Sequence, residues 1–276
     1  ERQWFITHEL YSIRNSNYLN LYSIKPYSID SSFLNLLNIY LGFSCRKRSY
    51  TLRESADKNT SIYNDKSNLN SVRHVRIDSK QGLLESIYRF PNATELTLES
   101  NFTASSLALT TVLNRILPLN LLTELVIDCG RFSLKKVMEL IQSAPSLHTL
   151  KLSSIPLFKD TRETIQQSEL FQVVSATNKV RHVIYSEVCK LEDLKLLVAL
   201  FPRAKQLTIN NYAQDLQTNV WFLLDKQNEH TRHLCSLRFT SASKIWIKRL
   251  DRLLRSQLLI RNYTLKMFNR QLYLSW

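Results

Sequence analysis

Residues 144–152 read Ala144-Pro145-Ser146-Leu147-His148-Thr149-Leu150-Lys151-Leu152. The apolar residues follow the phrase apolar-x-x-apolar-x-apolar. In an extended strand, residues two apart share one side, and the residues between them face the other way. The proline cannot continue a preceding helix, and it favours an extended start to the strand. The stretch therefore predicts the end of a helix, a short turn and a strand that is buried on one side.

The same phrase occurs seven times, at intervals of 21 to 33 residues. Two other copies follow similar joints, Phe90-Pro91-Asn92 and Phe201-Pro202-Arg203. Repeats of this length, each with one short strand, are typical of leucine-rich repeats, in which every unit pairs a strand with a helical segment. The copies begin at Val72, Ala93, Leu122, Leu147, Val180, Ala204 and Leu234.

Apolar residues with helical spacing lie between the strands. One strand-helix unit is too small to bury its own apolar face, whereas stacked units bury a continuous core. We therefore expect an α/β chain folded as a leucine-rich-repeat solenoid, with irregular, helix-bearing repeats and a curved parallel sheet. The alternative is a compact α/β fold in which buried strands merely alternate with helices. The apolar helix faces are Leu107, Thr111, Leu113 and Ile116; Leu134, Val137, Met138 and Ile141; and Trp246, Leu250, Leu253 and Leu254.

The two ends of the chain differ from the middle. Residues 1–70 lack the phrase, are rich in Tyr and Phe, and end in a polar stretch at 57–70. We interpret them as an atypical N-terminal capping or linker segment. Residues 71–276 form the predicted repeat domain, with about seven degenerate repeats and a closing strand at 272–276. Because the first residue is Glu1 and not Met, we expect the chain to be a fragment.

Composition excludes several classes of function. Three glycines are too few for a phosphate-binding loop or a dinucleotide fingerprint, and no apolar run is long enough to span a membrane. The four cysteines are scattered singly, which favours free thiols in the cytoplasm or nucleus. No histidine array, nucleophile motif or pair of carboxylates stands out. We therefore expect a binding module and not an enzyme, with no cofactor and no metal.

The outward residues of the strands form the predicted binding surface on the concave face. In the second and third copies they make an acidic stripe, which we define as Glu95, Glu99, Glu124 and Asp128. On a chain with a formal net charge of +14, this local reversal suits a basic peptide or protein segment. Ordinary solvated strand faces are the alternative. The remaining predicted contact residues are Thr97, Thr149, Lys151, His182, Gln206 and Arg238.

Positive charge is concentrated at the C-terminal end. Residues 241–276 hold eight basic residues and one acidic residue. Lys248, Arg252 and Arg255 fall on one face of a predicted helix, opposite its apolar face. This basic C-terminal face predicts docking to an acidic protein or to nucleic acid, or alternatively is the solvated side of a capping helix.

The stretch from Val72 to Trp276 resembles the repeat region of F-box/leucine-rich-repeat proteins. The likeness is carried by residues 90–98, 144–152, 168–174, 231–237 and 272–276, and Trp4 to His8 looks like the segment that follows the F-box there. In that family the F-box docks to the adaptor of a cullin-RING ubiquitin ligase, and the repeats select a protein substrate. The F-box itself is not visible in this sequence, so the adaptor is an expected partner only if a box lies upstream of Glu1.

Three functions stay open on the sequence. The first is a substrate-recognition domain of an F-box-type ubiquitin-ligase receptor, as the resemblance implies. The second is a leucine-rich-repeat scaffold with no ligase role. The third, which the sequence favours least, is a nucleic-acid-binding protein that uses the basic C-terminal face. None of the three requires a membrane.

Overall fold

The computed structural model describes residues 7–13, 16–22, 49–52, 66–99, 109–129, 132–153, 162–210, 215–240, 242–256, 260 and 262–276. The chain divides into two units, Glu1–Arg46 and Lys47–Trp276. In the first unit, β1 (Thr7–Ile13) pairs antiparallel with β2 (Ser16–Tyr22). Most of the segment 1–70, which the sequence assigns to a cap or linker, lies outside the described residues, and its role stays a prediction.

The second unit is a mixed α/β structure on one ten-stranded, mostly parallel sheet that is not closed into a barrel. From β3 to β10 every strand lies parallel to the next and stands in sequence order. The antiparallel strands β12 and β11 complete the sheet beyond β10. Its strands are β3 (Ser49–Leu52), β4 (His74–Ile77), β5 (Glu95–Leu98), β6 (Glu124–Ile127), β7 (Thr149–Leu152), β8 (His182–Val188), β9 (Gln206–Asn210), β10 (Ser236–Thr240), β11 (Thr264–Phe268) and β12 (Gln271–Ser275).

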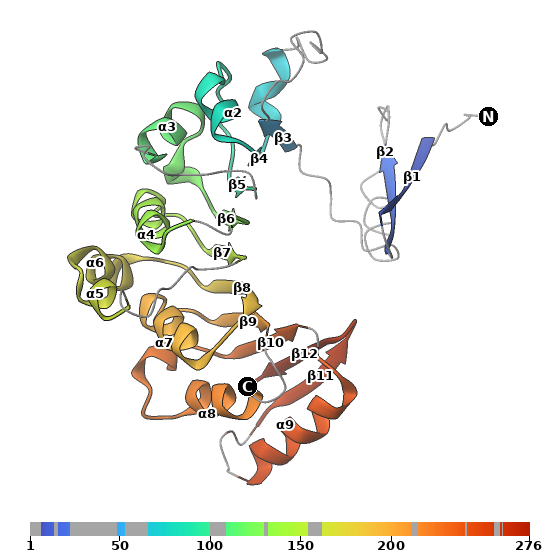
Figure 1. Cartoon of the computed structure of the whole chain (residues 1–276), viewed down its shortest axis with the longest axis vertical. Coiled ribbons are helices and arrows are strands. Elements are labelled where there is room, and N and C mark those ends of the chain that lie inside the picture. Colours follow the sequence, from blue (N-terminus) through green and yellow to red (C-terminus); the bar gives the residue numbers. More distant parts are fainter. Residues whose placement is uncertain are drawn as a thin grey trace. The chain divides into compact units, whose positions relative to one another are not determined.

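Helices connect the parallel strands, and α2 to α7 lie on one side of the sheet, to the left of the strands in Figure 1. Neighbouring helices pack on one another, α2 on α3, α3 on α4, α4 on α6, α6 on α7 and α7 on α8. We call the other face of the sheet, on which none of α2 to α7 lies, the open face. The helices are η1 (Lys66–Ser71), α2 (Lys80–Glu85), α3 (Leu109–Ile116), η2 (Leu119–Leu121), α4 (Leu134–Ser143), α5 (Arg162–Gln167), α6 (Glu169–Thr177), α7 (Leu191–Leu200), α8 (Leu216–Leu224), η4 (Glu229–Thr231) and α9 (Lys244–Ser256).

Two rows of apolar side chains run through the sheet beneath the helices. Every member is at most 2 % exposed. The strand pairing places the fourth residue of each phrase beside the fourth residue of the next, and the sixth beside the sixth. The predicted strands, their register and their buried side are therefore confirmed. The first row is Val75, Leu96, Leu125, Leu150, Val183, Leu207, Leu237 and Leu274, and the second is Ile77, Leu98, Ile127, Leu152, Tyr185, Ile209, Phe239 and Leu272.

The helices bury the faces that their spacing predicts, except that Leu253 of α9 is only half-buried and that α3 differs. Leu134, Val137, Met138 and Ile141 of α4 are all buried, as expected. In α3 the expected Thr111 is exposed, and Leu109 takes the buried place with Leu113 and Ile116. The prediction was wrong there because the helical face was counted from Leu107, which lies outside the described residues. Leu109, Leu113 and Ile116 have the i, i+4, i+7 spacing of one helix face.

A buried asparagine side chain joins two successive strand-helix repeats. Asn178 is 6 % exposed and follows α6. Its amide nitrogen donates to the carbonyl oxygens of Val174 at 2.7 Å and of Leu200 at 2.9 Å. One side chain therefore contacts carbonyls near the ends of both α6 and α7, and the carbonyl of Leu200 is one that a helix end cannot satisfy internally.

The sheet extends further than the sequence indicates at both ends. Ser49–Leu52 forms β3 and pairs with β4, although it lacks the phrase. At the other end the expected closing strand is β12, preceded by the unexpected β11. Asn269 and Arg270 join these two strands with φ values of 48° and 58°. Two consecutive left-handed residues match the twist of a tight hairpin turn, and Asn adopts this conformation readily.

The buried rows provide a direct test of the register. Leu150 is fully buried between Leu125 and Val183, so Leu150→Ala should lower the free energy of unfolding by about 2–5 kcal/mol. Urea denaturation of the whole chain measures the change. The adjacent Lys151 faces the open side, and Lys151→Ala should cost less than about 0.5 kcal/mol. Equal losses for the two variants would contradict the register.

Cysteine reactivity tests the packing without a core substitution. Burial raises the pKa of Cys129 and of Cys189 to about 12, and the neighbouring carboxylates Asp128 and Asp193 add to the effect. Cys235 is exposed. Only thiolates are reactive, so a Cys45→Ser chain should show rapid alkylation at Cys235 alone at mildly alkaline pH. Fast reaction of Cys129 or Cys189 in the folded protein would contradict this packing.

Candidate protein-recognition surface on the open face of the sheet

The open face carries the side chains that alternate with the two buried rows. Because parallel strands pair residue for residue, outward residues at equivalent positions form rows that run across the strands. Glu95 lies beside Glu124, Glu124 beside Thr149, and His182 beside Gln206. The repeat pattern thus brings together side chains that are 24 to 33 residues apart in the sequence.

The acidic stripe is assembled as the spacing predicts. Glu95 and Glu124 are cross-strand neighbours, and adjacent strands lie about 4.8 Å apart. Glu99 and Asp128 follow the same two strands, and their backbone NH groups donate to Ile77 and Leu98. The four carboxylates therefore occupy two rows of one patch.

Neighbouring groups hold part of this patch in place. Arg76 of β4 forms an ion pair with Glu99, and the Ser153 hydroxyl donates a hydrogen bond to Asp128. The Arg76 side chain is 47 % exposed, so this pair is solvated and of modest strength. Arg76 thus offsets part of the charge of the acidic stripe.

The remaining predicted contact residues differ in how far their side chains are exposed to solvent. Thr149 and Lys151 of β7 and Gln206 of β9 are half-buried on the open face, and His182 of β8 is exposed. Thr97 is only 8 % exposed. Its hydroxyl lies 2.8 Å from Nε2 of His74, so Thr97 supports a neighbouring side chain and offers little surface of its own.

Arg238 is held by partners that the sequence does not suggest. Its Nε donates to Oε1 of Gln271 at 3.0 Å, and its guanidinium carbon lies 5.0 Å from the ring centroid of Tyr273. Tyr273 donates its hydroxyl proton to the same Gln271 oxygen at 2.7 Å. A cation over an aromatic face is stabilised by the ring's quadrupole. Tyr273 and Gln271 lie on β12, whose pairing with β10 the sequence does not reveal.

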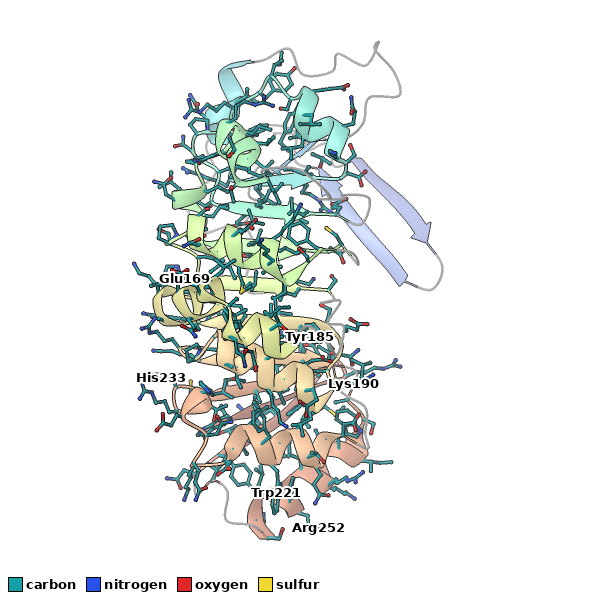
Figure 2. The ribbon with its side chains drawn as sticks, turned by 60° about the vertical axis from the view of Figure 1, so that its left-hand side comes forward. Glu169, Tyr185, Lys190, Trp221, His233 and Arg252 are labelled. Carbon is teal, nitrogen blue, oxygen red and sulfur yellow. The ribbon has the colours of Figure 1, made fainter. Side chains whose placement is uncertain are left out.

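The basic C-terminal face is partly neutralised within its own helix. Lys248 and Arg252 of α9 are exposed, but Arg255 pairs with Asp251 at 3.0 Å one turn earlier. The hydroxyl of Tyr263 donates to the other oxygen of Asp251 at 2.6 Å. Arg252, labelled in Figure 2, also borders a groove of about 250 Å³ between α8 and α9. Within the described residues, Lys248 and Arg252 of the predicted set form no ion pair.

Two kinds of feature are absent from the described ranges. No group of three or more His, Cys, Asp and Glu residues there could hold a metal ion. None of the helices in those ranges has both the length and the apolar character to cross a bilayer.

The chain matches no protein-family model, no curated protein and no solved structure.

The contacts of Asp251 with Tyr263 and Arg255 give a test of the basic C-terminal face. The hydrogen bond from Tyr263, followed by Arg255, lowers the pKa of Asp251. Its stabilising contribution is therefore present at neutral pH and is lost as the pH falls through the folded-state value. Tyr263→Phe should raise the pKa of Asp251 towards its usual range, measured by an NMR titration of the side-chain carboxyl. An unchanged pKa would contradict the contact, and Tyr273→Phe is the matched control.

Proposed function

We propose that this chain is a leucine-rich-repeat recognition domain that binds a protein segment on the open face of its sheet. The proposal rests on the register of the strands. The seven copies of the phrase pair residue for residue, and each copy turns the same two positions inward. Such repetition supports a solenoid, in which each unit contacts only its neighbours. A compact α/β fold needs no common phrase.

The partner on the open face is a basic peptide or protein segment. The acidic stripe places four carboxylates on two adjacent strands, where Lys and Arg side chains of an extended segment reach them. Polar side chains continue the surface over β7 to β9, and Arg238 with Tyr273 lies beyond them on β10 and β12. A segment of several residues that crosses the strands would therefore contact groups of different chemistry along its length.

We further propose that the domain selects substrates for a cullin-RING ubiquitin ligase in the cytoplasm or nucleus. This step rests on the resemblance to F-box/leucine-rich-repeat proteins and requires an F-box upstream of Glu1. A repeat scaffold with no ligase role is the alternative. The exposed Lys248 and Arg252 keep a nucleic-acid role open as a lesser candidate.

The acidic stripe can be tested with a defined probe. A short fluorescein-labelled peptide rich in Lys and Arg should bind the whole chain, with affinity read by fluorescence anisotropy. Glu95→Gln combined with Glu124→Gln removes two charges at nearly constant shape and should weaken binding by about three- to tenfold. The matched control is Glu139→Gln with Glu169→Gln on the helices, which should leave affinity within about twofold. Equal losses of affinity in the two double variants would show that the peptide does not bind at the acidic stripe.

The ligase proposal has its own test. The product extended upstream of Glu1 is used to capture partners from a cell extract, and the cullin-RING adaptor is scored by mass spectrometry. The proposal predicts that the adaptor is recovered with the extended product and not with residues 1–276 alone. Absence of the adaptor from captures with the folded, extended product would overturn the ligase role and leave the recognition role standing.

A further inference from the structure

A second charged surface lies at the edge of the sheet where the helices end and the strands begin. The residues just before β8, β9 and β10 are neighbours across the sheet. The backbone NH of Lys205 donates to the carbonyl of Arg181 at 2.8 Å, and that of Cys235 donates to Lys205 at 2.9 Å. In Figure 2, His233 lies at this edge on the left, whereas Lys190, which follows β8, lies on the right.

Five basic side chains gather here, and all are exposed. Residues 178–182 and 201–206 contain no carboxylate. Within the described part of the chain, no ion pair engages any of the five. The exposed His230 and His233 flank them. We call this set the basic edge: Lys179, Arg181, Arg203, Lys205 and Arg232.

Helix capping explains only part of the basic edge. Helices α6, α7 and α8 end on this side, and cations are favoured near the negative end of a helix dipole. Arg203 uses this interaction, since its guanidinium donates to the carbonyl of Asn178 at 3.1 Å, just after α6. No hydrogen bond to a helix end engages Lys179, Arg181 or Lys205 in the described structure. Their charges are left facing solvent.

A groove of mixed lining adjoins the basic edge. Its volume is about 360 Å³, and its apolar side is formed by Leu223, Leu224, Leu234 and Trp276, with Lys226 and Arg232 beside them. Arg232 belongs to both surfaces, so a ligand on the basic edge reaches the groove without a gap. Asp225 also lines the groove, and its carboxylate accepts a hydrogen bond from the backbone NH of Gln227 at 2.9 Å.

We infer that the basic edge and this groove together bind an acidic protein segment, rich in Asp and Glu, that carries one large apolar side chain. Carboxylates would pair with Arg181, Lys205 and Arg232. The guanidinium groups of the two arginines offer forked donors that match a carboxylate. The apolar side chain would enter the groove over Leu223 and Leu234. The inference adds a second surface to the proposed function, with a partner of opposite charge from the one expected on the open face.

The surroundings favour a peptide over nucleic acid. The basic edge spans β8 to β10, about 10 Å across the strands. Glu124 lies two strands beyond His182. A phosphate backbone that continued across the sheet would be repelled there, whereas a short acidic peptide ends before it. Among the joint residues 178–182, 201–206 and 228–235, the only Phe, Tyr or Trp is the buried Phe201, so base stacking there is left to histidine rings.

The test uses the whole chain and four fluorescein-labelled probes. These are an Asp/Glu-rich peptide with one Leu, the same peptide with Lys at the acidic positions, the same peptide with Ser in place of Leu, and a random single-stranded oligonucleotide. The acidic peptide should bind best, and the Ser peptide should bind at least about threefold more weakly because the groove is left empty. Tighter binding of the oligonucleotide, through the same residues, would replace the proposal with a nucleic-acid site.

A matched pair of variants separates the basic edge from general attraction to a positive protein. Arg181→Glu with Lys205→Glu should weaken the acidic peptide at least about tenfold. Lys248→Glu with Arg252→Glu makes the same change in net charge on α9 and should have less than about a threefold effect. Equal losses, or no binding of the acidic peptide at low salt, would overturn the proposal. The Lys/Arg-rich peptide of the open-face test should bind the Arg181/Lys205 variant no more weakly than the parent chain, so the two proposals fail separately.

A second readout needs no substitution at the basic edge. Cys235 is exposed beside Lys205, and its Sγ lies 3.4 Å from the Lys205 carbonyl oxygen. In a Cys45→Ser chain, saturating acidic peptide should slow alkylation of Cys235 severalfold, whereas the Lys peptide should not. Unchanged alkylation at saturation would place the peptide elsewhere and contradict the proposal.

Discussion

The sheet depends on the burial of two apolar side chains from each strand against the helices and against the strands on either side. A single unit offers only a few such residues, for example Leu150 and Leu152 with the apolar face of α4, and cannot exclude water from them alone. Stacked in register, the same residues form continuous rows that are almost completely inaccessible to solvent. Stability in such an arrangement comes from each unit and from its contacts with the next. The capping at joints, such as that by Asn178, fixes the spacing between units.

This constraint also determines the surface. Because the fourth and sixth residues of each phrase must point inward, the third and fifth point outward, and their identities are then free to vary. On β5 and β6 the third residue is a glutamate, and on β10 the fifth is an arginine that rests on Tyr273. The identities of the residues just before the strands can vary as well, and the residues just before β8 and β9 are basic. One chain thus carries an acidic patch and a basic edge a few strands apart, which suits recognition of two segments of opposite charge.

The sequence predicts those features that depend on the period of the phrase. The seven strands, their register and the buried face of α4 follow from apolar spacing, and so does the proximity of Glu95 to Glu124. Features that depend on contacts between unlike segments are missed. The burial of Thr97 follows from its neighbour His74, and β3 and β11 lack the phrase. The shift in register between Tyr185 and Val188 likewise has no signal in the apolar spacing. The basic edge has a visible signal in the sequence, Lys179-x-Arg181 and Arg203-x-Lys205 before successive strands, but these residues lie outside the outward positions of the phrase.

Distances between spin labels on the open face test whether the strands stack in sequence order with a common register. One label is placed at Glu95→Cys on β5 and the second at His182→Cys on β8 or at Ser236→Cys on β10, with Cys45 and Cys235 replaced by Ser. Double electron–electron resonance should give a distance about 10 Å longer for the second pair, since two further strands intervene. Equal distances, or a shorter one to β10, would show that the strands do not follow one another in this order, and both proposed surfaces would lose their basis.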